Sequence, residues 1–309
     1  MARLLEKDRS LIHRYVKELV DQGIATKTWS GAHVKYMLTK SDPGNTVDDI
    51  LWEDEPFSYQ VRQTLDHHFL KFAPDGRMLV GSEGFREWCL ARNLNSLEKA
   101  RSFIDIHTYL EWKRDTCGLL DATKAFQKHV EILHVDRVFY ADQYRWMDFG
   151  RGKLAELTFY AKQSQNSSLI MQSISHVFPT LLCLLKQEDI DAIAITPWSI
   201  KRVNQLLGFL RKQLENQPQP FIRLKKYYPN KIPVPQKSLK SREERIHNAR
   251  DTIFIDIKKS DFSYKKVLLI DDFVGSWSTL NETAKKLKDL GAKKIIGFAF
   301  VGNLDLTYE

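Results

Sequence analysis

The sequence predicts an α/β protein with a parallel sheet flanked by helices, preceded by a smaller α+β region. Short apolar runs alternate with helical patterns through residues 138–303, and the runs are apolar throughout, as in strands buried on both faces. The first 92 residues instead combine a helical stretch with two hairpin patterns. These observations predict a parallel sheet domain behind an N-terminal α+β domain.

The chain divides into three parts on this basis. Residues 1–92 are predicted to be the α+β domain, residues 93–137 a helical connector, and residues 138–309 the sheet domain. The chain has 309 residues, of which 43% are hydrophobic and 28% charged. This length allows two domains, and the composition is typical of a soluble globular protein.

A helix is predicted near the N-terminus, because apolar residues recur at helical spacing between Leu11 and Val20 and Gly23 is placed to end it. Residues 24–29 and 33–38 are predicted to pair as a hairpin. A helix followed by a two-stranded wing resembles the C-terminal half of a winged helix-turn-helix, although the usual first helix is reduced or absent. The exposed helix face would contact nucleic acid or, alternatively, dock a protein or a second copy. The nucleic-acid contacts would be Arg9, Ser10, His13, Arg14 and Lys17.

A second hairpin and two further helices are predicted before the sheet domain. The hairpin turns at Asp75-Gly76, and a helix starts at about Ser82, which makes a second wing or a second module. Apolar residues between Leu97 and Leu110 follow a period of 3.6, so an amphipathic packing helix is expected in the connector.

Strands and helices alternate in the sheet domain. This alternation predicts a parallel sheet that binds ligands at the carboxyl ends of its strands. The predicted strands are residues 191–197, 251–257, 265–272 and 293–302, and the predicted helices are residues 199–215, 241–249 and 279–290.

One strand ends in two acids and is followed by a loop of small polar residues. Asp271 and Asp272 close the strand, and a helix starts at Thr279, where free N–H groups and the helix dipole favour an anion. The acids suit the vicinal hydroxyls of a ribose, so the stretch predicts a site for a sugar 5-phosphate. Metal sites and response regulators also place two acids after a strand. The sequence contains neither a dinucleotide fingerprint nor a Walker A motif, which excludes the commonest nucleotide-binding rivals.

The stretch "VLLIDDFVGSWST" resembles the phosphoribosyl pyrophosphate (PRPP) signature of type I phosphoribosyltransferases. Three other segments resemble the ComF-like, amidophosphoribosyltransferase-like branch of that family, in the order that the branch uses. They are residues 139–162, 195–214 and 235–255. The four blocks cover about 165 residues, and the resemblance implies the type I phosphoribosyltransferase fold with PRPP, a ribose phosphate, as substrate.

The resemblance also implies residue roles. Asp271 and Asp272 would hold the ribose hydroxyls, and Arg242 and Arg245 would close over the leaving pyrophosphate; ordinary surface ion pairs are the alternative for the two arginines. Mg²⁺ would be bound mainly through PRPP. The 5-phosphate would be held by Gly275, Ser276, Trp277, Ser278 and Thr279, and pyrophosphate would face Thr196, Ser199 and Arg202.

Trp277 stands where the signature has glycine. Glycine serves where a backbone approaches a ligand or takes a positive φ, so an indole is expected to clash with the phosphate or to fill its place. Three explanations are open. The loop has lost PRPP binding in nature, the ring points outward or stacks on an unusual substrate, or a targeted change has inactivated a toxic enzyme.

The charge distribution and the domain combination predict partners. Residues 221–266 hold thirteen Lys or Arg against five Asp or Glu, which suits a polyanion or a solvated basic loop. A winged-helix-like region joined to a phosphoribosyltransferase-like domain resembles ribosyltransferase and DNA-binding effectors of retron phage-defence systems. That resemblance implies a toxin held by a reverse transcriptase with DNA or a DNA–RNA hybrid. The alternatives are a ComF-like metabolic or competence enzyme and a ligand-sensing, DNA-binding regulator.

The sequence predicts a cytoplasmic protein. Its first residues carry charges throughout rather than a secretory pattern, and no window approaches the roughly 18 apolar residues of a membrane span. Cys89, Cys117 and Cys183 are odd in number and widely spaced, so neither a disulfide framework nor a metal site is expected.

Overall fold

The structure is a computed structural model, and it describes residues 20, 25–30, 33–38, 57–228, 238–257, 264–275 and 277–304. The chain forms two compact units, one made of residues 1–56 with 305–309 and the other of residues 57–304. The domain boundaries expected near residues 92 and 137 stay predictions.

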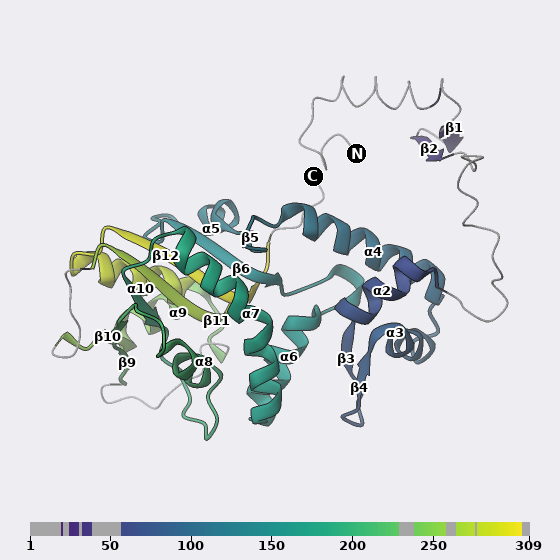
Figure 1. The fold of residues 1–309 in the computed structure, drawn as a ribbon. Helices are drawn as coiled ribbons and strands as arrows, with labels where there is room; N and C mark the ends of the chain where they lie inside the picture. Colours follow the sequence, from purple (N-terminus) through teal and green to yellow (C-terminus); the bar gives the residue numbers. More distant parts are fainter. Residues whose placement is uncertain are drawn as a thin grey trace. The chain divides into compact units, whose positions relative to one another are not determined.

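In the first unit, the described residues form the predicted hairpin (Figure 1). Strand β1 (Ala25–Ser30) pairs antiparallel with β2 (His33–Leu38), with Ser30 opposite His33. The expected nucleic-acid contacts lie outside the described residues: Arg9, Ser10, His13, Arg14 and Lys17. The winged-helix prediction is therefore not confirmed.

The second unit is an α/β fold around a six-stranded sheet with the strand order β5-β6-β12-β11-β7-β8. Five of these strands run parallel, and only the edge strand β5 is antiparallel. The predicted parallel sheet flanked by helices is thus confirmed. The strands are β5 (Leu120–Asp121), β6 (Arg137–Gln143), β7 (Ala192–Ile195), β8 (Phe221–Ile222), β11 (Lys266–Val274) and β12 (Lys294–Gly302).

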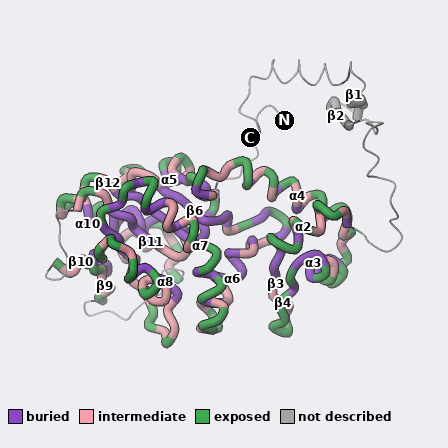
Figure 2. The backbone as a smooth tube through the Cα atoms, viewed as in Figure 1, coloured by how far each residue is buried: buried purple, intermediate pink, exposed green. Residues whose placement is uncertain are grey.

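Two hydrophobic clusters cover the two faces of this sheet, and Figure 2 shows its central strands buried between the helices. Successive residues of β11 point to opposite faces, so Leu269 belongs to one cluster and Leu268 to the other. Helices α5 and α10 supply side chains to the first cluster, and α6, α7 and α8 to the second. The helices are α5 (Thr123–His129), α6 (Lys153–Ser164), α7 (Ser167–Gln187), α8 (Leu206–Leu214) and α10 (Ser278–Asp289).

The segment before the sheet packs onto the first of these clusters. Phe69, Phe85 and Phe103 pack together there, with ring centroids 5.0 to 5.9 Å apart. The second predicted hairpin and both predicted helices are confirmed. The elements are α2 (Tyr59–His68), β3 (Leu70–Phe72), β4 (Met78–Val80), α3 (Gly81–Leu90) and α4 (Ser96–Lys113), with a 3-10 helix η1 (Met147–Phe149) after β6.

Two predicted elements of the sheet domain need correction. Residues 251–257 do not join the parallel sheet, because helix α9 (Arg242–Thr252) runs into them and only β10 (Ile253–Ile255) is extended. Strand β10 pairs instead with β9 (Leu224–Lys226) in a separate antiparallel ribbon. The helix expected over residues 199–215 begins only at Leu206, because the residues before it form a loop at the sheet edge.

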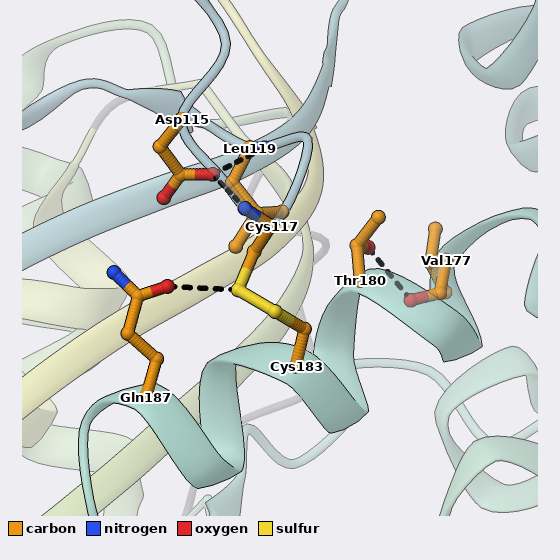
Figure 3. Close-up of a disulfide and its surroundings, with 7 residues drawn as sticks. All are labelled: Asp115, Cys117, Leu119, Val177, Thr180, Cys183 and Gln187. Carbon is orange, nitrogen blue, oxygen red and sulfur yellow. Dashed lines mark hydrogen bonds between the residues drawn. A yellow bond between two sulfur atoms is a disulfide. The ribbon is translucent and has the colours of Figure 1, made fainter.

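The prediction about cysteines is wrong for two of the three. Cys117 and Cys183, 66 residues apart in the sequence, form a disulfide between the loop before β5 and helix α7 (Figure 3). Asp115 shapes this loop, because its Oδ1 accepts hydrogen bonds from the backbone N–H groups of Cys117 and Leu119 at 2.9 and 2.8 Å. The pairing results from packing of the loop on α7, which spacing in the sequence does not show.

Helix α7 is also long and apolar enough to cross a membrane by length and composition, contrary to the expectation from the sequence. One such helix is weak evidence, because core helices pass the same test. Seven of its residues are buried in the fold, and it packs on α6 and α8. The expectation of a protein without a membrane partner stays a prediction.

Candidate functional site

The carboxyl ends of β7 and β11 open into a cavity of about 450 Å³. These strands are neighbours in the sheet, and Ile195 at the end of β7 lies opposite Ile270 in β11. The cavity therefore sits where parallel α/β sheets bind ligands. Nine of the predicted site residues line it: Thr196, Ser199, Arg202, Arg245, Asp271, Asp272, Gly275, Trp277 and Thr279.

Three predicted site residues are not placed in the cavity wall. Arg242 is exposed on α9 and Ser278 is buried at the start of α10, so neither lines the cavity. Ser276 lies outside the described residues.

Asp271 is the more enclosed of the two acids. Its Oδ1 accepts hydrogen bonds from Thr196 Oγ1 and from the backbone N–H of Asp272, both at 2.9 Å. Burial, with the negative charge of Asp272 as the second cause, raises the pKa of Asp271 to about 7. This carboxyl group therefore exchanges a proton near neutral pH.

Asp272 is paired with a residue that the sequence does not point to. Lys162 Nζ lies 2.8 Å from Asp272 Oδ1 and 2.7 Å from Oδ2. The two residues are 110 positions apart, and α6 carries the lysine to the end of β11. Each acid thus has a partner of its own within the fold.

The loop after β7 is fixed to the C-terminal end of α6. Arg202 donates a hydrogen bond to the carbonyl oxygen of Lys162. Gln165, which ends α6 in a left-handed conformation with φ of 56°, accepts from Val203 N at 2.9 Å and from Asn204 Nδ2 at 2.7 Å. The polar wall around Thr196 and Arg202 is therefore tied to the helix that carries Lys162.

A second lysine faces this loop from the ribbon β9. Lys226 Nζ donates to Ser199 Oγ at 2.7 Å, and Tyr228 Oη lies 3.4 Å from the carbonyl oxygen of Ser199. Burial lowers the pKa of Lys226 to about 8, although the charge of Asp271 opposes the shift. Sequence reasoning included Lys226 only in a basic run, because nothing local separates it from its neighbours.

Trp277 is buried, so the alternative in which its ring points outward is wrong, whereas the expectation that the ring takes the place of the phosphate stays a prediction. Its side chain is 8% exposed, and its ring meets Phe126 edge to face, with centroids 4.6 Å apart. Tyr140 lies beyond, at 6.1 Å. The backbone takes the positive φ of 63° that the signature glycine would allow, and α10 begins at the next residue. The loop thus has the backbone conformation of a glycine at Trp277, and the buried ring of this residue fixes the loop to the core.

The two arginines of α9 differ in position. The helix starts at a capping box in which Ser241 and Glu244 satisfy each other's backbone N–H groups. Arg245, one turn into the helix, reaches the cavity wall, and its guanidinium group donates to the carbonyl oxygen of Leu239 at 3.0 and 3.2 Å. The exposed position of Arg242 agrees with the alternative of an ordinary helix surface.

The side chains at the cavity do not fit a divalent ion bound directly by the protein. Within the described ranges, no group of three or more His, Cys, Asp or Glu is placed to hold a metal. Asp271 is hydrogen-bonded to Thr196, and Asp272 is paired with Lys162. Binding of Mg²⁺ through PRPP stays a prediction.

No protein-family model matches the chain. A 55-residue segment is 36% identical to Competence protein F of Haemophilus influenzae. The segment is 18% of this chain and 24% of that protein, so the chain matches about a quarter of its relative's length. The chain is thus similar in part to the protein whose branch the motifs resemble.

Proposed function

We propose that the chain is a phosphoribosyltransferase-like protein that binds PRPP, or a related ribose 5-phosphate, in the cavity between β7 and β11. The observation that supports it best is the placement of Asp271 and Asp272 among the last four residues of the central parallel strand β11, which a short loop joins to the N-terminus of α10. The similarity to Competence protein F points to the same class.

The charges of the cavity suit such a ligand. Among the residues that the structure describes, four cationic side chains line it, against two carboxyl groups of which Asp271 is partly protonated at neutral pH. An anion therefore meets a net positive wall. The cations are Lys162, Arg202, Lys226 and Arg245.

In the proposed complex, the ribose hydroxyls donate to the two acids and the 5-phosphate accepts from the first N–H groups of α10. Pyrophosphate lies between the loop after β7 and Lys226. The bond from the anomeric carbon to a pyrophosphate oxygen breaks, and the electron pair leaves with pyrophosphate. A lone pair of the acceptor forms the new bond from the opposite face, and the acceptor proton passes to solvent. Arg202 and Lys226 stabilise the charge that develops on the leaving group.

Calorimetric titration of PRPP tests the proposal, with Asp272→Asn as the variant and Asp289→Asn as the matched control. Asp289 is an exposed acid at the far end of α10. The native chain and the control are expected to bind equally, and Asp272→Asn is expected to bind at least about tenfold more weakly, because hydrogen bonds to a charged group contribute about 1.5 to 3 kcal/mol. Absence of PRPP binding to the native chain would refute the proposal.

The biological setting of this activity is also a proposal. A toxin held by a reverse transcriptase and nucleic acid predicts growth arrest on expression, relieved by Asp272→Asn. A metabolic or competence enzyme, the class that the similarity to Competence protein F favours, predicts turnover of a base or amine with PRPP and no arrest. A ligand-sensing regulator predicts duplex DNA binding that changes with PRPP.

A further inference from the structure

The ammonium group of Lys162 contacts both carboxylate oxygens of Asp272, as a bound metal ion would. Its Nζ is within 2.8 Å of both carboxylate oxygens, and the side chains of Lys162 and Asp272 are 28% and 14% exposed. A charge pair at this depth is screened less by water than an exposed pair, so the contact is strong enough to set the orientation of the carboxylate.

The position of Lys162 is fixed by its own backbone. Its carbonyl oxygen accepts the hydrogen bond of Arg202, and Gln165, three residues later, holds Val203 and Asn204. These contacts join the last turn of α6 to the loop that forms the opposite wall of the cavity. They fix the backbone from which the side chain of Lys162 reaches Asp272.

The remaining charges make Asp272 a poor place for a second cation. Asp271 is partly protonated near neutral pH, and Arg202, Lys226 and Arg245 add positive charge to the same cavity. A divalent ion on Asp272 would have to displace the ammonium group of Lys162 against these charges.

We propose that Lys162 is the built-in cation of this site: it takes the place of a divalent ion at Asp272 and positions that carboxylate for its ligand. Two consequences follow. The native chain does not bind a divalent ion at its acids, and ligand binding does not depend on one. The second consequence rests on the proposed function, whereas the first does not.

The first consequence is tested with Mn²⁺ alone, titrated into the full chain and followed by electron paramagnetic resonance of the free ion. The native chain and the control Lys128→Met, at an exposed position on α5, are expected to bind no Mn²⁺ at the acids. Lys162→Met is expected to gain one site in the micromolar to millimolar range, which Lys162→Met with Asp272→Asn loses again. Lys162→Arg keeps the charge and is expected to behave as the native chain.

Two results would overturn the proposal. One is Mn²⁺ binding to the native chain that Asp272→Asn abolishes, and the other is a folded Lys162→Met that binds none. Thermal melts establish folding of each variant, and Lys162→Gln replaces Lys162→Met if the latter does not fold.

The second consequence is tested by titrating ribose 5-phosphate in EDTA and in Mg²⁺. The native chain is expected to bind within about twofold in the two buffers. Lys162→Met is expected to bind about tenfold more weakly in EDTA and to recover part of the loss in Mg²⁺.

If ribose 5-phosphate and PRPP fail to bind while the Mn²⁺ results are as expected, the proposed function is wrong and the role of Lys162 stands. Native binding that is lost in EDTA would overturn the role of Lys162 and leave the proposed function intact.

Discussion

The two loops that form the cavity are held in place by opposite means. Between β11 and α10, the chain turns within a few residues and is anchored from the core by the buried ring of Trp277. Between β7 and α8 lie ten residues, and the hydrogen bonds that Arg202 and Val203 donate to Lys162 and Gln165, at the C-terminal end of α6, hold them. This second loop leaves Trp198 49% exposed and Val203 93% exposed.

The difference shows when a protein tolerates backbone strain. A left-handed conformation costs a residue with a side chain roughly 1 to 2 kcal/mol, yet truncation of a buried Trp costs about 3 to 5 kcal/mol. Packing therefore outweighs the strain at Trp277. The loop after β7 has no such anchor, because its aromatic residue Trp198 lies half in solvent.

The largest effect is expected from Trp277→Gly. The substitution removes the ring from Phe126 and Tyr140 but relieves the positive φ, so we expect a loss of about 2 to 4 kcal/mol in the free energy of unfolding, measured with urea. The matched control Trp198→Gly, in the other loop, is expected to lose less than about 1 kcal/mol. Equal losses in the two variants would contradict the comparison.

Gly302→Ala is expected to disturb the packing of Trp277 indirectly, through Tyr140. A Cβ atom at Gly302 would lie 2.3 Å from the ring of Tyr140, which supports Trp277. Overpacking of this kind costs about 1 to 3 kcal/mol, so we expect a loss of that size in the same urea experiment. Gly297→Ala, on the same strand but with the nearest heavy atom 3.3 Å from its Cβ position, is the matched control and is expected to lose less.

The pH dependence of ligand binding reports on both loops, because Asp271 lies in the strand before the Trp277 loop and Lys226 contacts the loop after β7. As pH rises from 7 to 9, Asp271 loses its proton near its pKa of about 7, and Lys226 loses its charge near its pKa of about 8. Both changes make the cavity more negative, while a ribose phosphate with a second pKa of about 6 keeps its charge. We expect the dissociation constant of ribose 5-phosphate to rise about tenfold over this range, measured by calorimetry.

Two variants separate the contributions to this profile. Lys226→Met is expected to remove the part of the rise near pH 8. Thr196→Val removes a hydrogen bond that lowers the pKa of Asp271, so the part near pH 7 is expected to move to higher pH. A flat profile for the native chain would contradict the placement of these two groups in the ligand site.

The smallest effect is expected from Asn204→Ala in the loop after β7. It removes the hydrogen bond to the carbonyl oxygen of Gln165, and one such bond contributes about 1 kcal/mol to stability. We expect a loss of that size in urea unfolding and a few-fold weaker binding of ribose 5-phosphate. The exposed Asn93→Ala, outside the cavity, serves as the control for binding.

Local patterns were sufficient for the parts of the fold that depend on neighbouring residues. The run from Val267 to Ile270, followed by Asp271 and Asp272, predicted a buried strand with the acids near its end, although β11 continues through Val274. The second hairpin and α10 were predictable for the same reason, since turns and amphipathic spacing lie within a few residues. The strand expected over 251–257 failed because α9 continues into it, and an apolar run that short does not distinguish a sheet strand from a ribbon.

The sequence by itself determined the class of fold and the edge of the sheet at which a ligand would bind. Only the tertiary structure decided which residues complete that edge: Lys162 reaches Asp272 across 110 positions, Phe126 and Tyr140 receive the ring of Trp277, and the disulfide joins α7 to a distant loop. The physical reason is that strand and turn preferences act within a few residues. The partner of a buried charge or ring is fixed by which helices pack on which face of the sheet.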